Sequence, residues 1–366
     1  MHIKRIKLKD FRNYESLDIS VGPRNNLFFG NNAQGKSNLL EAVYFLAFLS
    51  SCRTQKNHEV IRWGMPGFYV MAEIEREDAK KVIEVSFSEG CKKLKINSKR
   101  KYRLPGLDES IKIVSFLPTD PDIIMGPAMS RRRFLNLEIS QIDAAYRHHL
   151  VRYQSIIFQR NSLLRLRRHR NVPEKEIVPW NNQLVEAGSH IIKKRSAIIS
   201  KISKTAGAIH RCLTKEKESL EMYYVASFNI DGDAEKDFNS ALEKNLEKET
   251  HLGATITGPH RDNLAILING KDASVFGSRA QKRSAALSVR LAWVELIKSI
   301  IGESPVVLLD DMLSELDPAR RESVLEFLRP YKAQCFITAT DPSLVSTSLN
   351  GAAVFHVDNN KVVHSP

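Results

Sequence analysis

The chain has 366 residues, 42% of them hydrophobic, which fits two domains or one domain with an added lobe and excludes an intrinsically disordered chain. A net charge of +13 favours a polyanionic partner, with nucleic acid as the first candidate. No apolar run reaches the roughly 18 residues of a membrane span. The four cysteines form no C-x-x-C pair, so neither a zinc site nor a disulfide framework is expected. Because no secretory apolar segment opens the sequence, we expect a cytoplasmic protein.

The first third of the chain predicts β-strands, because short apolar and β-branched runs lie between Gly, Pro and polar residues. These runs are Ile3–Leu8, Leu17–Val21, Asn26–Phe29, Phe68–Ile74, Val82–Phe87 and Ile111–Leu117. One helix interrupts them, because Leu39, Val43 and Leu46 share one helical face.

Helical periodicity dominates from about residue 131 to 215, with a turn predicted at Pro173–Pro179. A strand at Met222–Ile230, a helix at Ala234–Lys248 and a strand at Leu264–Ile268 follow. From Ser278 onward the order is helix, strand, helix, strand, which is typical of α/β folds. We therefore predict an α/β head built from both chain ends, residues 1–120 and 253–366, with a mainly helical lobe at 121–252.

A phosphate-binding loop is predicted between the strand Asn26–Phe29 and the helix after it. The pattern G-x-x-x-x-G-K-[ST] is fitted by Gly30, Asn31, Asn32, Ala33, Gln34, Gly35, Lys36 and Ser37. Backbone N–H groups and a helix N-terminus would bind phosphates, Lys36 would contact the β- and γ-phosphates, and the Ser37 hydroxyl would ligate Mg²⁺. The alternative is a chance glycine turn, which the flanking strand and helix disfavour.

A second half of an ATP site lies near the other end of the chain, roughly 270 residues later. Val306–Leu309 is a continuous apolar run, typical of a buried parallel strand. At its end Asp310 would hold Mg²⁺, and Asp311 would orient or deprotonate the attacking water. The alternative is that the two aspartates only cap the next helix.

Two helix starts accompany these motifs. Ser278 with Gln281 begins a long helix, and a serine at the positive end of a helix can bind phosphate. Ser314–Pro318 precedes another helix, where Asp317 could simply act as a cap.

The order of these motifs resembles an ABC-type ATPase head. Segment 8–14 and the loop at 30–37 look like the branch shared by SMC and RecF proteins. Further segments favour the RecF family, and the resemblance covers essentially the whole chain. These segments are residues 131–135, 153–154 with 160–161, 258–262 and 309–317.

This resemblance implies a homodimer that encloses two ATP molecules. Ser278 and Gln281 of one subunit would face the γ-phosphate held by the loop of the other, and Arg12 would lie near the base or the α-phosphate. Asp311 would be the catalytic carboxylate. Ala280 stands where RecF-like proteins usually have glycine, so the dimer is expected to be affected at this point.

The resemblance further implies a weak, DNA-stimulated ATPase that binds double-stranded and gapped DNA in recombinational repair. It would work with RecR, and through it with RecO, in loading RecA. Two alternatives stay open: the nucleotide-binding subunit of a membrane transporter, and a monomeric kinase for which DNA is irrelevant.

The helical lobe is rich in arginine, with ten arginines against two acids over residues 131–170. Such a cluster could follow DNA phosphates without reading sequence. The alternative is that the arginines form a solvated face or ion pairs with the acidic helix near 233–249. The candidates for DNA contact are Arg131, Arg132, Arg133, Arg160, Arg165 and Arg168.

Overall fold

The computed structural model describes residues 1–76, 79–101, 110–170, 173–342 and 351–365. The chain forms two compact units, which we call the head (Met1–Asp120 with Trp293–Pro366) and the insert (Pro121–Ala292). The sequence predicted that the head resumes at residue 253, whereas in the structure the second segment of the head begins at Trp293. The reason is long-range strand pairing, because β10 (Asn263–Ile268) pairs antiparallel with β9 (Leu220–Val225) and so belongs to the insert.

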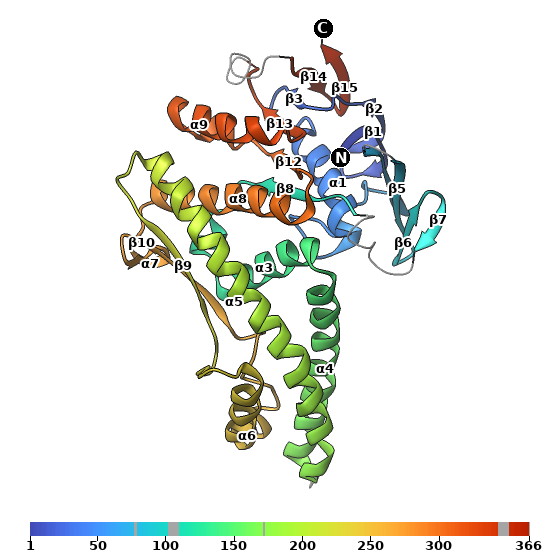
Figure 1. The fold of residues 1–366 in the computed structure, drawn as a ribbon. Coiled ribbons are helices and arrows are strands. Elements are labelled where there is room, and N and C mark those ends of the chain that lie inside the picture. Colours follow the sequence, from blue (N-terminus) through green and yellow to red (C-terminus); the bar gives the residue numbers. More distant parts are fainter. Residues whose placement is uncertain (77–78, 102–109, 171–172, 343–350, 366) are drawn as a thin grey trace. The chain divides into compact units, whose positions relative to one another are not determined.

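The head contains two six-stranded sheets (Figure 1). The first has the order β2-β1-β4-β5-β6-β7 and is antiparallel; the second has the order β15-β14-β3-β13-β12-β8. Their bounds are β1 (His2–Phe11), β2 (Tyr14–Ser20), β3 (Asn25–Phe29), β4 (Gly67–Arg76), β5 (Ala79–Ser88), β6 (Cys91–Ile96), β7 (Lys99–Lys101), β8 (Ile113–Phe116), β12 (Val306–Leu309), β13 (Cys335–Ala339), β14 (Ala353–Asp358) and β15 (Lys361–Ser365).

The second sheet explains how distant motifs meet. β3, β13 and β12 are parallel neighbours, so their carboxyl ends lie at the same edge of the sheet. The loop at 30–37 follows β3, and Asp310 follows β12. The order of the strands in this sheet therefore brings together two motifs that are roughly 270 residues apart in sequence.

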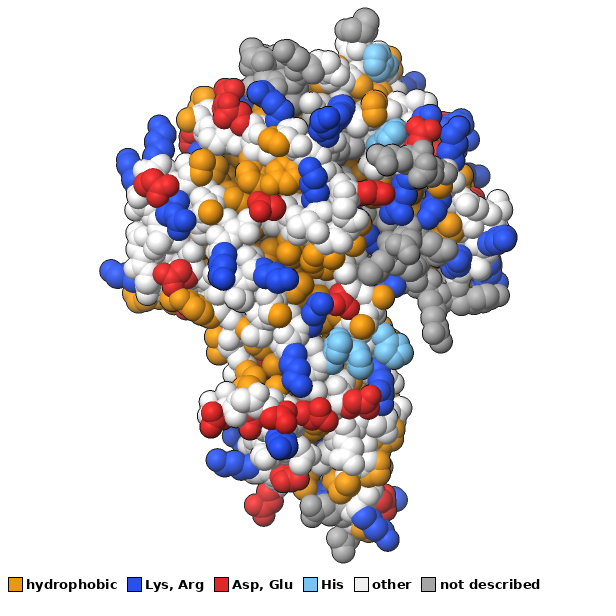
Figure 2. Space-filling view, in the orientation of Figure 1, with side chains coloured by type: hydrophobic (Ala, Val, Ile, Leu, Met, Phe, Trp, Pro, Cys, Tyr) orange, Lys and Arg blue, Asp and Glu red, His pale blue; other side chains and the backbone are white. Residues whose placement is uncertain are grey.

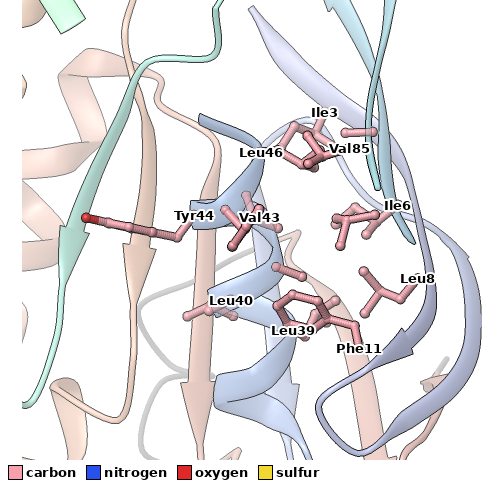
Figure 3. Packing of buried hydrophobic residues seen from close by; sticks show 14 of the residues in the cluster. Ile3, Ile6, Leu8, Phe11, Leu39, Leu40, Val43, Tyr44, Leu46 and Val85 are labelled. Carbon is pink, nitrogen blue, oxygen red and sulfur yellow. The ribbon is translucent and has the colours of Figure 1, made fainter. Parts of the chain in front are cut away.

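The core of the head forms between α1 (Lys36–Phe48) and the first sheet (Figure 3). Leu39, Val43 and Leu46 of α1 are buried, as their predicted helical spacing requires, and they pack with residues of β1 such as Ile6 and Leu8. The head also contains α9 (Pro318–Leu328) and short 3₁₀ helices at Asn57–Val60, Leu313–Glu315 and Arg329–Tyr331. This packing fixes the first turn of α1, which is the end that carries Lys36 and Ser37.

The insert is mainly helical, and its long helices α4 and α5 lie side by side (Figure 1). Its elements are α2 (Asp122–Met125), α3 (Ala128–Ile142), α4 (Ala144–His169), a 3₁₀ turn (Glu174–Glu176), α5 (Val178–Thr214), β9, α6 (Ala234–Leu252), β10, β11 (Lys271–Asp272) and α7 (Ala273–Phe276). Helix α8 (Arg279–Ile301) begins in the insert and ends in the head.

Three local expectations differ from the structure. Pro179 lies in the first turn of α5 rather than in a preceding turn, a position that proline favours. β9 ends at Val225, before the predicted end at Ile230. The short strands β6, β7, β14 and β15 were not predicted, because lysines or histidines interrupt their apolar pattern.

In the part of the chain that the structure describes, no helix has both the length and the apolar character needed to cross a membrane.

Candidate functional site

The loop at 30–37 has the backbone that a phosphate cradle requires. Gly30 and Gly35 adopt positive φ angles of 147° and 111°. A Cβ atom at Gly30 would lie 2.2 Å from the carbonyl oxygen of Val357, so only glycine fits there. The first turn of α1 has no side-chain cap and no acidic residue, which leaves its positive end for an anion.

Lys36 is buried beneath this loop. Its Nζ donates to the carbonyl oxygens of Gly30 (2.7 Å) and Asn31 (2.8 Å). A lysine ammonium has three N–H donors, so one of them remains for a phosphate. Lys36 thus stiffens the loop and places a positive charge beneath it.

A hollow of about 150 Å³ joins the loop to the second motif. Asp311 borders it together with loop residues, so the two halves predicted from the sequence meet in space. The hollow is lined by Asn32, Ala33, Gln34, Gly35, Lys36, Ser37, Asn38, Arg53 and Asp311.

Thr338 holds both aspartates at the end of β12. Its hydroxyl donates to Asp310 Oδ1 (3.0 Å) and accepts from the backbone N–H of Asp311 (2.8 Å). Asp310 is buried, whereas Asp311 is partly exposed and has a positive φ of 50°. The two carboxylates therefore have different surroundings, although they are adjacent in sequence.

Arg53 is part of this site, although no motif in the sequence indicated it. Its Nη2 atom lies 3.2 Å from Asp310 Oδ2, and its Nη1 donates to Asn38 Oδ1 at 3.0 Å. It also lies 3.7 Å from the buried carboxylate of Glu41. The guanidinium thus links the first turns of α1 to the carboxylate at the end of β12.

Arg12 approaches the same helix from the first sheet. Its Nη2 and Nε donate to Glu41 Oε1 and Oε2 at 2.6 and 3.0 Å, which fixes the guanidinium in one plane. Arg12, Asn38 and Arg53 border a second hollow of about 700 Å³. This hollow also contains Trp63, which is 96% exposed and which the sequence reasoning missed. A role for Arg12 toward the base or the α-phosphate stays a prediction.

Ser278 and Gln281 form a reciprocal cap at the start of α8. Gln281 N donates to Ser278 Oγ (3.2 Å), and Ser278 N donates to Gln281 Oε1 (2.8 Å). The Ser278 hydroxyl accepts in this cap and keeps its own proton for a ligand. Ala280 is exposed within α8 and is not among the residues with positive φ, so its backbone does not require glycine.

Arg160 does not belong among the DNA-contact candidates. Its side chain is fully buried, and Nη1 lies 2.7 Å from the equally buried Glu249 Oε2. The guanidinium also donates to Asn181 Oδ1 (2.8 Å) and Thr255 Oγ1 (2.7 Å). Glu249 lies on α6, so the ion-pair alternative is correct for this residue.

The other candidate arginines fall into two groups. Arg165 and Arg168 are exposed near the end of α4, whereas Arg131, Arg132 and Arg133 are partly buried in α3. Figure 2 shows acidic side chains beside basic ones over α5 and α6. Although the chain has a positive net charge, that face is therefore not uniformly basic.

Comparison with known proteins decides the family. The RecF/RecN/SMC N terminal domain family matches residues 2–363. The DNA replication and repair protein RecF of Natranaerobius thermophilus is 38% identical over 379 residues, covering 99% of this chain and 98% of the relative. The chain belongs to the RecF family.

Solved structures agree with this membership. A structure described as the recombination mediator protein RecF-ATP in the RecFOR pathway has a TM-score of 0.92 and 31% identity, covering 100% of this chain and 98% of that chain. An SMC head bound to the C-winged helix domain of ScpA has a TM-score of 0.57 and 16% identity, covering 100% and 98%. At that identity the likeness concerns the fold alone, which is the α/β head expected from the sequence. A RecF-family protein with ATP bound therefore shares the full architecture of this chain.

Proposed function

We propose that this RecF-family chain is an ATP-dependent DNA-binding protein of recombinational DNA repair. The observation that carries the proposal is the hollow in which the loop at 30–37 and Asp311 meet. The RecF-ATP structure described above supports ATP as the ligand. The net charge of +13 supports a nucleic acid as the partner.

In this proposal the head residues have separate roles. Backbone N–H groups of the loop and Lys36 bind the phosphates. Ser37 and Asp310 fit a hard, hydrated cation, because both offer oxygen atoms and Asp310 is held in place by Thr338 and Arg53. Mg²⁺ bound there would neutralise phosphate charge. Asp311 orients the attacking water and accepts its proton.

A second copy of the chain completes the site. The Ser278 hydroxyl, oriented by Gln281, donates to the γ-phosphate held by the partner subunit's loop. ATP binding then closes the dimer on double-stranded DNA near gaps, and slow hydrolysis opens it. As a RecF-family protein the chain would act with RecR and RecO to assist RecA loading.

Sedimentation velocity and duplex DNA binding, each with and without ATP, test this mechanism. In wild type we expect ATP to produce a dimer and to tighten DNA binding. Lys36→Arg removes the small ammonium beneath the loop and should abolish both responses, whereas Lys56→Arg, an exposed lysine outside the loop, should keep them. A wild-type chain that responds to ATP in neither assay contradicts the proposal.

Ser278→Arg separates the dimer from the two alternatives. The variant should still bind ATP but lose hydrolysis, because in the proposed dimer the Ser278 hydroxyl of wild type acts on the ATP bound by the partner subunit. Hydrolysis that is unchanged in Ser278→Arg and independent of protein concentration would indicate a monomeric kinase-like enzyme instead. ATP-dependent dimers without any DNA affinity would favour a transporter-type subunit.

A further inference from the structure

The segment 258–262, which has no role in the proposed ATP mechanism, is held rigidly inside the insert. Gly258 has a φ of 120°, and a Cβ atom there would lie 2.6 Å from Tyr153 Oη. Asp262 is buried, accepting hydrogen bonds from Ser227 N (2.7 Å) and from the Tyr224 hydroxyl. These contacts make the segment a fixed support rather than a mobile loop.

His260 adds to this support without adding charge. Its Nε2 lies 3.0 Å from the carbonyl oxygen of Thr255, and its Nδ1 lies 2.7 Å from the Tyr153 hydroxyl. Because a carbonyl only accepts, Nε2 carries the hydrogen and Nδ1 accepts from Tyr153. Burial lowers the pKa of His260 to about 4, so the ring is neutral near pH 7.

Two arginines are attached to this support through neutral oxygen atoms. Arg132 Nη1 donates to the carbonyl of Asp262 (2.9 Å), and Arg261 donates through Nε and Nη2 to the carbonyl of Thr255 (both 3.3 Å). Arg261 is exposed and Arg132 is partly buried. Each guanidinium has five N–H donors, and among the described residues these carbonyls are the hydrogen-bond partners of Arg132 and Arg261, so further N–H groups remain for a ligand.

Further positive charge surrounds this pair. Arg195 donates to the carbonyl of Pro259 (2.7 Å), and Arg131 donates to Asn263 Oδ1 (2.9 Å). Within the described part of the chain, none of these four arginines lies within 4.0 Å of a carboxylate. Other arginines of the insert are neutralised, for example Arg152 by Glu186 at 2.7 Å.

The start of α3 strengthens the same positive region. Three arginines follow its first residue closely, no side chain caps it, and its first turn has no acidic residue. Arginine is normally unfavourable at the positive end of a helix. The nearby carboxylates are already hydrogen-bonded, Asp262 as described and Asp272 to the N–H and hydroxyl of Ser274. Arg131 and buried Arg195 also support the insert, because they donate to oxygens of Gly126, Asn136 and Pro259. Because all of these partners are uncharged, the hydrogen bonds leave the positive charge of the region in place.

We propose that Arg132 and Arg261, supported by segment 258–262, bind phosphates of the DNA backbone. This inference rests on the proposed function, to which it adds a defined contact site. A phosphodiester suits the pair because the planar guanidinium fork matches two phosphate oxygens. The cluster contains no nucleotide-binding glycine loop, so it is not a second site for ATP. Contact through phosphates alone makes the binding independent of base sequence.

The test uses full-length protein with ATP and a fluorescent duplex over a range of salt concentrations. In the double variant Arg132→Gln, Arg261→Gln, we expect affinity to fall on the order of tenfold and the slope of log affinity against log salt to decrease by about 1.8, since each phosphate contact contributes about 0.9. Replacing both arginines with lysine should restore most of the slope. Arg152→Gln, which removes an arginine already paired with Glu186, should leave it unchanged.

The outcomes separate this site from the wider function. A double variant that dimerises with ATP like wild type and keeps the wild-type salt slope overturns the phosphate site while leaving the proposed function intact. The phosphate site is also overturned if the double variant keeps the wild-type affinity for DNA but loses affinity for an acidic peptide. If wild type itself has no DNA affinity with ATP, the proposed function and this site both fail.

Discussion

The head and the insert use arginine in opposite ways. In the head, Arg53 is 41% exposed at its side chain, borders an open hollow and bridges the buried carboxylates of Glu41 and Asp310. In the insert, Arg160 and Glu249 are both fully buried, so their pairing maintains packing. The number of arginines in a segment therefore says little about binding. What matters is whether a carboxylate already neutralises the guanidinium and whether solvent reaches it.

The largest predicted effect is a loss of stability on removal of a buried charge. Arg160→Met leaves Glu249 without its partner at 0% exposure and should lower the free energy of unfolding by about 3–5 kcal/mol. Arg165→Gln, which changes an exposed arginine on the same helix, should alter it by no more than about 0.5 kcal/mol. Urea denaturation followed by circular dichroism measures both. Full stability of Arg160→Met, combined with lost DNA binding, would show that the buried pair is not structural.

The neutral histidine beneath Arg261 makes the insert sensitive to acid. His260 has a pKa of about 4 when folded, against 6.5 when unfolded, so the unfolded chain binds more protons between these values. Its contribution to stability is complete above pH 6.5 and is lost as the pH falls to about 4, amounting to about 3 kcal/mol. His260→Gln cannot titrate and should show a correspondingly smaller loss of stability over that range. Parallel curves of unfolding free energy against pH for the two proteins would refute this.

Local signals predicted the part of the site that follows from strand order. The loop at 30–37 and Asp310 each follow a recognisable strand, and parallel strands bring both to one edge. Arg53 could not be predicted, because its contacts with Glu41 and Asp310 link segments that share no local pattern.

Two errors in the insert have different origins. The burial of Arg160 was visible in the helical spacing, since Tyr153, Ile156 and Leu164 are buried on the same face of α4. The boundary at residue 293 was not visible, because it depends on β10 pairing with a strand that lies before α6.

A smaller effect, on the rate of ATP hydrolysis, is expected from removal of the Thr338 hydroxyl in the head. Thr338→Val keeps the shape of the side chain but removes the hydrogen bonds to Asp310 Oδ1 and from Asp311 N. A loss of about 1.4 kcal/mol in the positioning of these aspartates corresponds to roughly a tenfold lower kcat for ATP hydrolysis. ATP affinity should change far less, because the loop is untouched, and Thr338→Ser should restore kcat. An unchanged kcat in Thr338→Val would mean that the hydroxyl does not position Asp310 and Asp311 for the proposed hydrolysis.

The smallest effect is expected at Ala280, where the insert would meet the partner's nucleotide. Glycine is not needed for the backbone, because Ala280 lies within α8 and does not have a positive φ. The methyl group is exposed, so the most that Ala280→Gly can change is one methyl contact, about 0.8 kcal/mol or roughly fourfold in affinity. Glycine also weakens the first turn of the helix slightly, which opposes any gain. Sedimentation with ATP should therefore give nearly the same dimer affinity for both proteins. A tenfold tighter dimer in Ala280→Gly would show that close backbone approach at this position, rather than the Ser278 hydroxyl, limits closure.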